Sequence, residues 1–547
     1  MTEGALGPDA RAEAVARFER ERLDVLVIGG GITGVGIALD AVSRGLSVGL
    51  IEAVDLAAGT SSRSSKLIHG GLRYLEMLEF KLVHEALRER RLLLTKLAPH
   101  LVRPVEFLFP LTRRGWERPY MGAGLLLYDL WAGRHLPRAR HLSRGAALKA
   151  APALRPDSLI GAVSFSDAQE DDALYAVYVA RTASARGASI ATRVRAVSFL
   201  RDEAGRILGV GAEDRLTGRR LDIRARHTIA AVGVATDSLL EEATGRAQST
   251  VRPSKGVHLI VPRASIPMRS GLFMRTEKSV FHAIPWGREH WLLGDTDTEW
   301  DGEVDTPVAN RADVDYVLAK VNSVLLRPVQ REEIRGVFAG LRPLVAAEGA
   351  ADTTRLSREH RLFSPVPGLT AIAGGKYTTY RVMARDAVDA AGRDLGSTAP
   401  STTDRLPLLG AAPSPGGDHD PLRRRHGACA DEVRLLAQAN SDLATPLAGE
   451  LGYLTAEAVH AVTHQGALDL DDILSRRMRV SIEAPDRGRA AAAAIAPLVA
   501  PPLGWSEARA AEEVDRYLRL RDAEEAAEAA PDDTAAAAAY RALAPGP

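Results

Sequence analysis

The stretch DVLVIGGGITGVGIALDAVSRGLSVGLIE, residues 24–52, decides the fold of this chain. An apolar run at 25–28 leads into a set of glycines, then a stretch with helical spacing, then a second apolar run at 48–51 that ends in Glu52. Continuous apolar runs of this length are typical of parallel strands that are buried on both faces. The order strand, turn, helix, strand therefore predicts a β-α-β unit within an α/β fold.

The glycines of this unit have the spacing of a dinucleotide-binding turn, Gly29-x-Gly31-x-x-Gly34. Gly29 permits the tight turn, Gly31 lets the backbone approach a pyrophosphate, and Gly34 lets the helix pack on the strand. The helix N-terminus then offers free N–H groups to the phosphates. Glu52, about 20 residues further on, is placed to accept hydrogen bonds from a ribose diol. The motif predicts a dinucleotide and leaves FAD and NAD both open.

The composition is that of a globular protein and excludes several classes. Of 547 residues, 46% are apolar and 26% are charged, and the formal net charge is zero, so no global charge favours nucleic acid. Cys429 is the only cysteine, which excludes an intrachain disulfide and any multi-cysteine metal site and fits a reducing compartment. The N-terminus lacks a secretory signal, and the longest uncharged apolar run is shorter than the ~20 residues of a spanning helix. A cytoplasmic chain is expected.

Regions of different texture predict the domain organisation. Residues 1–22 alternate in charge and form an N-terminal extension, and residues 23–400 alternate β-branched runs with helical stretches. Residues 401–420 are rich in Pro, Gly and Asp, which predicts a linker. Residues 421–547 have helical spacing and no strand alternation, which predicts a helical C-terminal domain. Strands are expected at 25–28, 48–51, 227–234, 257–261 and 369–373.

The segment GTSSRSSKLIHGGLRYLE, residues 59–76, follows Glu52 closely. Its serines and threonines offer hydroxyl and backbone donors to a second part of the ligand. Its HGG lets the backbone lie flat against a planar group, because glycine has no side chain. Arg73 begins a helical stretch. An ordinary solvated polar loop explains this composition too, so the segment does not decide the matter by itself.

A series of motifs occurs in an order and spacing that resemble a known family. The motifs are GGGITGVG, GTSSRSSKLIHGGLRYLE, RPSKGVHLIVP, IPWGREHWLLGDTDTEWDG, GLRPL, LSREH, GGKYTTYRVMARDAV and HQGALDLDDILSRRMRVSIE. They resemble those of the FAD-dependent glycerol-3-phosphate dehydrogenases, flavoproteins of the D-amino-acid-oxidase-like group. The resemblance runs from residue 24 to about 395 and resumes in the C-terminal region, so it covers most of the chain.

The resemblance implies a fold and an activity. The fold is a Rossmann-like FAD-binding domain, an interleaved antiparallel-sheet subdomain that caps the substrate at roughly 76–160 and 245–345, and an all-helical C-terminal domain. The activity is hydride transfer from C2 of sn-glycerol 3-phosphate to flavin N5, which gives dihydroxyacetone phosphate, with electrons passed on to a quinone. Members are often peripherally attached to membranes, and the basic residues of 133–144 suit anionic lipid headgroups. A solvated basic loop explains them equally well; a homodimer is a further hypothesis.

The resemblance also implies functional residues. Substrate contacts would fall on Arg73, Tyr74, His258, Arg342 and Arg358, and the catalytic groups on His258, Arg342 and Lys376. Contacts to FAD would fall on Gly29, Gly31, Ile32, Thr33, Gly34, Glu52, Thr60, Ser61, Ser62, Ser64, Lys66, Leu67, His69, Gly70, Gly71, Gly233, Gly375, Lys376, Tyr377 and Thr378.

Elementary chemistry agrees with these roles. A phosphate monoester is a dianion near neutral pH, and arginine is always charged and grips it bidentately. Oxidising the alcohol requires a base for its hydroxyl proton, and His258 is the natural candidate because an unperturbed histidine titrates near ~6.5. An arginine-stabilised alkoxide is the alternative. A helix expected from about Thr378 would direct its N-terminus at the flavin and stabilise negative charge there.

The chain departs from the family pattern at three positions. Ala230 and Ala235 stand where the family commonly has asparagine and tryptophan, which changes the local packing. Asp295 stands where threonine is more usual and puts a carboxylate near the expected site.

Two motifs suggest metal ligands, and neither is interpreted as a metal site. His460 and His464 have ligand spacing on a helix, but no glutamate base of the HExxH type and no evident third ligand accompany them, so a surface or interface pair is favoured. DTDTEWDGE resembles a calcium loop, yet Trp300 and Thr306 occupy the positions of its glycine and final glutamate.

Other activities on the same fold stay open. A glycerol-3-phosphate oxidase shares the first half-reaction but gives electrons to oxygen and releases hydrogen peroxide. An amine or amino-acid oxidase would meet a carboxylate, whereas several arginines suit a dianion better. A further alternative, which is not an enzyme, is a catalytically inactive flavoprotein that serves as a binding module.

Overall fold

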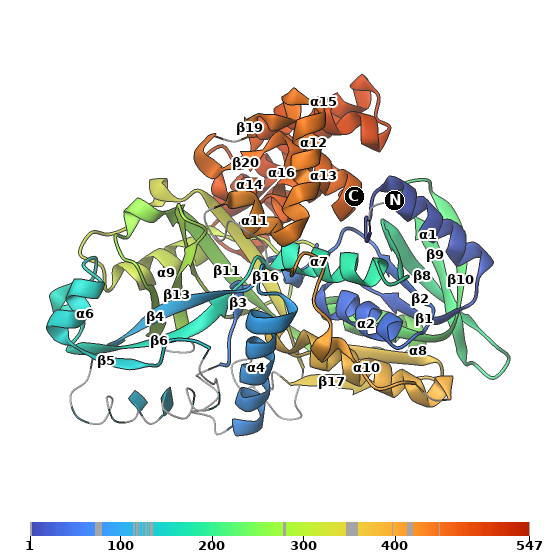
Figure 1. Ribbon diagram of the computed structural model, residues 1–547, viewed down its shortest axis with the longest axis horizontal. Helices are drawn as coiled ribbons and strands as arrows, with labels where there is room; N and C mark the ends of the chain where they lie inside the picture. The colour runs from blue at the N-terminus through green and yellow to red at the C-terminus, as the bar shows by residue number, and fades with distance from the viewer. Residues whose placement is uncertain are drawn as a thin grey trace.

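Two β-sheets lie side by side in the computed structural model, and a group of C-terminal helices lies over their junction (Figure 1). The structure describes residues 3–71, 79–112, 135–276, 280–345, 359–396, 398–412, 420–447 and 449–545, together with residues 115, 119, 121, 122, 124, 125, 128 and 131. Arg73, Tyr74 and Arg358 therefore lie outside the described residues.

In the described part of the chain, the first sheet has eight strands and a parallel centre. Its main path is β17-β18-β10-β1-β2-β7, and β10 also pairs with β9, which pairs with β8. The pairs from β18 to β7 along this path are parallel, whereas β17, β9 and β8 join in antiparallel pairs. The strands are β1 Leu23–Ile28, β2 Val48–Glu52, β7 Ser189–Thr192, β8 Val194–Arg201, β9 Ile207–Asp214, β10 Arg219–Ala230, β17 His360–Phe363 and β18 Leu369–Gly374.

The apolar runs on both sides of the glycine motif are strands β1 and β2, so the predicted β-α-β unit and the α/β class are confirmed. The run expected at 369–373 is strand β18. The run expected at 227–234 is a strand only in part, because β10 ends at Ala230 and a 3₁₀ turn follows. Gly233 has φ +56° in that turn, a left-handed backbone that cannot continue an extended strand.

Helices cover both faces of the first sheet. Val25 and Val27 of β1 share a core with α2, α7 and α10, whereas Leu26 and Ile28 point to the opposite face and share a core with α1. Phe18 of α1 is buried there, so the expected N-terminal extension contributes to the core of the sheet. A shorter helix, α8, packs near β8 and β18. The bounds are α1 Pro8–Arg20, α2 Ile32–Ser43, α7 Asp172–Ser184, α8 Thr236–Thr244 and α10 Tyr380–Leu395.

Among the described residues, the second sheet has ten strands. Their order is β15-β11-β14-β13-β12-β4-β6-β3, with β16 beside β11 and β5 beside β6. Of the pairs between its described strands, β12 with β4 alone is parallel. The run expected at 257–261 lies within β11. The strands are β3 Leu67–Ile68, β4 Arg103–Leu111, β5 Arg140–Ser143, β6 Gly161–Gln169, β11 Val251–Pro262, β12 Gly271–Arg275, β13 Val280–Trp286, β14 His290–Gly294, β15 Thr298–Glu299 and β16 Gly336–Val345.

Helix α9 packs on β11 and β14 of the second sheet and closes a second core around the fully buried Trp291. Helix α4 runs beside the junction of the two sheets (Figure 1). The bounds are α4 Phe80–Leu92, α6 Arg144–Ala150 and α9 Arg311–Asn322. Of these helices, α9 packs on β11, the strand that carries His258.

The C-terminal region is helical, as predicted, apart from a ladder of two short strands, β19 and β20. The described part of the expected linker, residues 401–412, packs against the core on one face of the first sheet. Leu408 is buried in this core, and its N donates to Leu97 O at 2.8 Å. In the described part of the chain, no helix is both long and apolar enough to cross a bilayer. The elements are α11 Pro421–His426, α12 Ala430–Ala439, β19 Pro446–Leu447, β20 Tyr453–Leu454, α13 Thr455–Gln465, α14 Val480–Glu483, α15 Arg489–Leu503, α16 Glu507–Ala529 and α17 Asp533–Leu543.

Buried ion pairs join the C-terminal region to the first sheet. Asp55, fully buried after β2, accepts hydrogen bonds from Arg476 Nε at 2.6 Å and from Arg477 Nη1 at 2.8 Å and Nη2 at 2.7 Å. Both arginines lie in a π-helical turn, η14 Asp472–Arg477. Burial alone would raise the pKa of Asp55, but Arg477 and Arg476 lower that pKa to about 2. The carboxylate therefore stays ionised and holds the two regions together.

We expect Asp55→Asn to destabilise the protein by about 3–5 kcal/mol, because it removes the counter-ion of buried Arg477 and one of the three carboxylates around Arg476. The sign with pH follows from the lowered pKa. The share of stability due to ionised Asp55 is present above the ordinary value of 3.8 and is lost as the pH falls from about 4 towards about 2. Urea unfolding of wild type and variant at pH 7 and along this acid range measures both effects.

Asp522→Asn is the matched control, since Asp522 is 56% exposed in its pair with Arg489. A surface pair of this kind contributes about 0–1 kcal/mol. Equal losses in the two variants, or an acid response that Asp55→Asn leaves unchanged, would contradict the prediction.

Candidate functional site

A cavity of about 1870 Å³ lies at the junction of the two sheets. Gly29 and Glu52 line it at the carboxyl ends of β1 and β2, Gly375 lines it before α10, and His258 and Arg342 line it from the second sheet. The cavity is larger than the roughly 300–1,000 Å³ of a pocket for a drug-sized ligand. Its size and its lining suit a long ligand that reaches from one sheet to the other.

The glycine turn has the geometry that its spacing predicts. Gly29 has φ +109°, which the tight turn after β1 requires. A Cβ on Gly34 would lie 1.9 Å from Gly29 O, so this position must be glycine if α2 is to pack against the turn. A Cβ on Gly31 would lie 3.1 Å from Ser61 Oγ, and that hydroxyl accepts a hydrogen bond from Ile32 N at 2.9 Å. Gly29, Gly31, Ile32 and Thr33 line the cavity, whereas Gly34 serves the packing of the helix.

Glu52 closes the other side of this turn. Its Oε2 accepts a hydrogen bond from Gly30 N at 2.6 Å, and its Oε1 accepts one from Val54 N at 2.8 Å. Burial raises the pKa of Glu52, against the effect of these two backbone donors. The carboxylate is thus fixed at the edge of the cavity, where a ribose diol of a bound dinucleotide would meet it.

The serine-rich loop after β2 divides into a cavity face and a buried face. Of the residues predicted there, Thr60, Ser61, Ser64, Leu67, His69 and Gly71 line the cavity. Ser62, Lys66 and Gly70 do not belong to the lining that the described residues form. Lys66 is fully buried, and its Nζ donates to Asp172 Oδ1 at 2.7 Å and to Ser62 O at 3.1 Å. Lys66 thus fixes the loop on the face that points away from the cavity, through its bonds to Ser62 O and Asp172.

The second glycine turn precedes α10. Gly374 and Gly375 have φ +77° and +84°, and Gly375, Lys376, Tyr377 and Thr378 line the cavity. Thr378 Oγ1 accepts a hydrogen bond from His69 N at 3.1 Å and so joins this turn to the serine-rich loop. The helix expected from about Thr378 begins at Tyr380, after a 3₁₀ turn. Gly233, Ala235 and their neighbours form another part of the lining.

His258 is placed on β11 by strand pairing. Its partner across the ladder is Gly294 of β14, where a Cβ would lie 2.4 Å from His258 Cδ2. The His258 ring stacks on Phe338 at 5.0 Å, and its Nε2 lies 2.9 Å from Ser65 Oγ. Burial, opposed by Asp295 and reinforced by Arg342, lowers the pKa of His258 to about 4. The imidazole is therefore neutral at physiological pH and able to accept a proton.

Arg342 lies across the same wall from β16. A Cβ on Gly256 would lie 2.4 Å from Arg342 Nη2, so the glycine of the KGVH motif makes room for the guanidinium. Arg342 Nη2 donates to Asp295 Oδ2 and, at 2.9 Å, to Thr296 O. Burial alone would raise the pKa of Asp295, but Arg342 and the neighbouring histidines lower it to about 2. The carboxylate that departs from the family pattern is thus ionised and directly paired with Arg342.

Residues that the sequence analysis did not single out also contribute to this wall. His282 of β13 pairs across the ladder with Gly294, so it flanks the same glycine as His258. Its imidazole lines the cavity, and burial lowers its pKa. Ser65, adjacent to predicted residues, supplies the hydroxyl beside His258. The sequence does contain a sign of this role: His282 lies within the otherwise apolar stretch VFHAIPW. Burying a polar side chain in a strand is unfavourable unless it has a partner or a function.

The comparisons with known proteins cover nearly the whole chain. A family model described as FAD dependent oxidoreductase matches residues 24–381, and one described as C-terminal domain of alpha-glycerophosphate oxidase matches residues 401–510. Glycerol-3-phosphate dehydrogenase 2 of Mycobacterium tuberculosis H37Rv is 48% identical over 550 residues, which cover 97% of this chain and 94% of the relative. Glycerol-3-phosphate dehydrogenase of Mycobacterium leprae is 50% identical over 551 residues, with the same coverage.

The solved structures agree with this family. The glycerol-3-phosphate dehydrogenase from Bacillus halodurans complexed with FAD has a TM-score of 0.76 and 27% identity, and the match covers 94% of this chain and 98% of that chain. The L-alpha-glycerophosphate oxidase from Mycoplasma pneumoniae with FAD bound has a TM-score of 0.54 at 18% identity over 71% of this chain and 99% of that chain, which is a likeness of fold.

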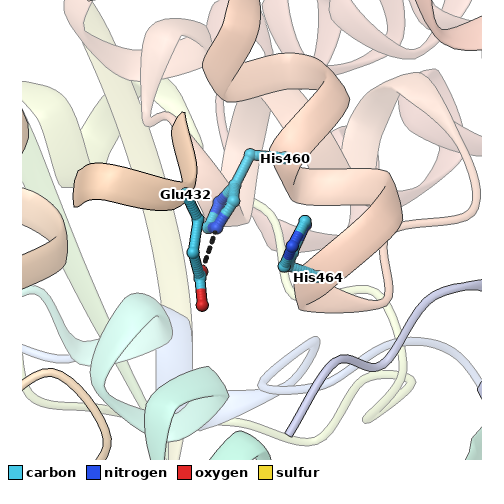
Figure 2. Close-up of side chains that lie close together, drawn as sticks. All are labelled: Glu432, His460 and His464. Carbon is cyan, nitrogen blue, oxygen red and sulfur yellow. Dashed lines mark hydrogen bonds and ion pairs between the residues drawn. The ribbon is translucent and has the colours of Figure 1, made fainter. Parts of the chain in front are cut away.

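Outside the cavity, one cluster among the described residues could offer ligand atoms to a metal ion (Figure 2). Figure 2 shows Glu432 on α12 facing His460 and His464 on α13, and Glu432 Oε2 lies 2.7 Å from His460 Nε2. However, both Glu432 oxygens accept hydrogen bonds from Arg181 Nη2, each at 3.0 Å, and the Arg181 side chain is fully buried. The carboxylate already neutralises a buried cation, so we interpret the cluster as an ion-pair network that joins α7, α12 and α13.

We expect Glu432→Gln to destabilise the protein by about 3–5 kcal/mol, because Arg181 would be buried without a counter-ion. One equivalent of zinc should leave the thermal midpoint of the wild type unchanged. Calorimetric unfolding with and without zinc measures both, with His464→Ala as the control. A zinc-dependent rise in the midpoint that His464→Ala abolishes would show a metal site and contradict this interpretation.

Proposed function

The chain belongs to the FAD-dependent glycerol-3-phosphate dehydrogenases, and on that premise we propose that it oxidises sn-glycerol 3-phosphate to dihydroxyacetone phosphate by hydride transfer from C2. The observation that carries this proposal is identity of 48–50% to glycerol-3-phosphate dehydrogenases over 97% of the chain. The cavity supports it, since neutral His258 and cationic Arg342 line it from the second sheet and the glycine turns line it from the first.

The residues around the cavity fit FAD. The turn before α2 has no side chain at Gly31, where a Cβ would meet Ser61 Oγ, and α2 has no acidic residue in its first turn, so its N-terminus suits a pyrophosphate. Glu52 would hold the ribose, and the turn at Gly375 would lie against the ring system. Bound FAD would supply, at N5, an acceptor for the hydride of the substrate.

The chain itself handles the proton and the phosphate. His258 is neutral and only 2% exposed, so we propose that it takes the hydroxyl proton of the substrate while hydride leaves the adjacent carbon. Ser65 Oγ, 2.9 Å from His258 Nε2, orients the ring. Arg342 supplies positive charge for the phosphate or for the developing alkoxide. Lys376 adds a second cation beside the turn at Gly375. Both the proton and the hydride of the alcohol are thereby accounted for.

The remaining parts of the proposal rest on the family resemblance. We propose that Arg73, Tyr74 and Arg358 complete the phosphate site, that a quinone takes the electrons, and that the protein works in the cytoplasm at the inner face of the cell membrane. A homodimer is the proposed oligomeric state. The domain organisation is proposed with its boundaries at residues 23, 401 and 421.

Anaerobic addition of glycerol 3-phosphate should bleach the flavin band of the purified holoenzyme. A water-soluble quinone should then restore the band much faster than air does, with little hydrogen peroxide formed. Stopped-flow absorbance and a peroxide assay measure these steps. A flavin band that stays unchanged with FAD bound would contradict the proposed activity, whereas fast reoxidation by air with stoichiometric peroxide would make the protein an oxidase.

Arg342→Ala should raise KM for glycerol 3-phosphate by roughly 10- to 100-fold, because a charged hydrogen bond to the substrate contributes about 1.5–3 kcal/mol. The FAD content should stay intact, since the guanidinium pairs with Asp295 and Thr296 within the second sheet. Steady-state kinetics and the ratio of flavin to protein absorbance measure these quantities. Arg288→Ala, at an exposed hairpin turn, is the control. Unchanged kinetics in Arg342→Ala would remove this residue from the substrate site.

A further inference from the structure

The guanidinium of Arg342 is held by more negative charge than it can neutralise. Beside its bonds to Asp295 and Thr296 O, its Nη1 donates to Ser254 Oγ at 3.3 Å and lies 3.7 Å from Asp297 Oδ1. The side chains of Arg342, Asp295 and Asp297 are 21%, 14% and 6% exposed, so water screens them poorly. One cation thus faces two carboxylates in the wall that the substrate phosphate is proposed to meet.

The same wall surrounds His258 with charges from several elements. Asp295 approaches it from the end of β14, Arg342 from β16, Lys66 from the loop before β3, and His282 from β13. Asp295 raises the pKa of His258, whereas the three other groups lower it. Of these four groups, Asp295 is therefore the one that favours the protonated form of the imidazole.

This arrangement has a consequence for proton transfer. A neutral His258 that accepts a proton becomes a buried cation beside Arg342 and Lys66, which is unfavourable unless an anion lies close by. The carboxylate of Asp295 is fully ionised and adjacent. However, Asp295 also pairs with Arg342, so an incoming dianion would have to share this arginine with Asp295 and would bind more weakly.

We propose that Asp295 is a positioning residue of the reaction, which fixes Arg342 across the cavity wall and stabilises the proton that His258 takes from the substrate. This inference rests on the proposed function. In this chain, the Asp295 carboxylate would make His258 a stronger base and would at the same time weaken the binding of the substrate phosphate by Arg342. Asp295 acts through Arg342 and His258 and need not touch the substrate.

Asp295→Asn tests the proposal, because it keeps the shape of the side chain and removes its charge. We expect kcat at pH 7.5 to fall about three- to tenfold, since a weaker base transfers the proton less readily. We expect KM to fall by a similar factor, because Arg342 is released to the phosphate. The acid limb of the kcat profile should move down by about one pH unit, because removing a neighbouring opposite charge shifts a pKa by about 1–3 units.

A binding measurement gives a readout that does not depend on turnover. Dihydroxyacetone phosphate, titrated into the oxidised holoenzyme in a calorimeter, should bind about three- to tenfold more tightly to Asp295→Asn than to wild type. A merely structural role for Asp295 would weaken binding instead. Asp297→Asn is the matched control: it also removes a charge beside Arg342, but Asp297 is not among the strongest influences on the pKa of His258, so affinity should change with a smaller shift of the acid limb than in Asp295→Asn.

The outcomes separate the two levels of the proposal. A wild-type flavin that glycerol 3-phosphate does not bleach would overturn the proposed function and this inference with it. If wild type is active and Asp295→Asn keeps its FAD with unchanged KM and an unchanged acid limb, the inference alone is wrong. Asp295→Thr guards against a folding defect of the asparagine variant. Loss of FAD from both variants would make Asp295 a folding residue and would also overturn the inference.

Discussion

The wall of the cavity depends on one buried carboxylate, that of Asp172 at the start of α7. It accepts hydrogen bonds from Ser64 N at 2.9 Å, from Ser64 Oγ and Lys66 Nζ at 2.7 Å each, and from Arg479 Nη2. Burial alone would raise the pKa of Asp172, but Lys66 and Arg479 lower it below its ordinary value, so the group stays ionised. The serine-rich loop, the first turn of α7 and the C-terminal region therefore meet at one point, and the loop presents its other face to the cavity.

The position of the cavity follows from the topology of the two sheets. The parallel strands of the first sheet end at one edge, and Gly29, Glu52 and Gly374 lie at or directly after the ends of β1, β2 and β18. Ligands of open α/β sheets bind outside this carboxyl edge. The second sheet meets the edge with β11 and β16, whose register sets His258 opposite Phe338 and Ser254 opposite Arg342. The residues proposed to hold cofactor and substrate thus converge although long stretches of chain separate them.

The sequence allowed the first half of this site to be predicted, because its signals are local. The spacing of Gly29 and Gly34 follows from sterics within one turn, and it predicts the β-α-β unit on its own. Lys66 shows where such prediction ends. A cation in a polar loop was expected at the cofactor, yet it pairs with Asp172, 106 residues further along the chain. His282 likewise joins the site only through the register of β13 on β14, which no local pattern reveals.

The buried carboxylates of this protein differ in what their charge can do. Asp55 and Asp172 each pair with two cations from segments that are distant in the sequence. Their negative charge is neutralised in ion pairs that join these segments. Asp295 meets one cation and two neutral imidazoles at a cavity wall. Without Asp295, a proton accepted by His258 would lie beside Arg342, Lys66 and the His282 ring, all of which disfavour its positive charge. Asp55 and Asp172 are therefore structural ion pairs, whereas Asp295 pairs with one cation beside the imidazole that we propose accepts the proton.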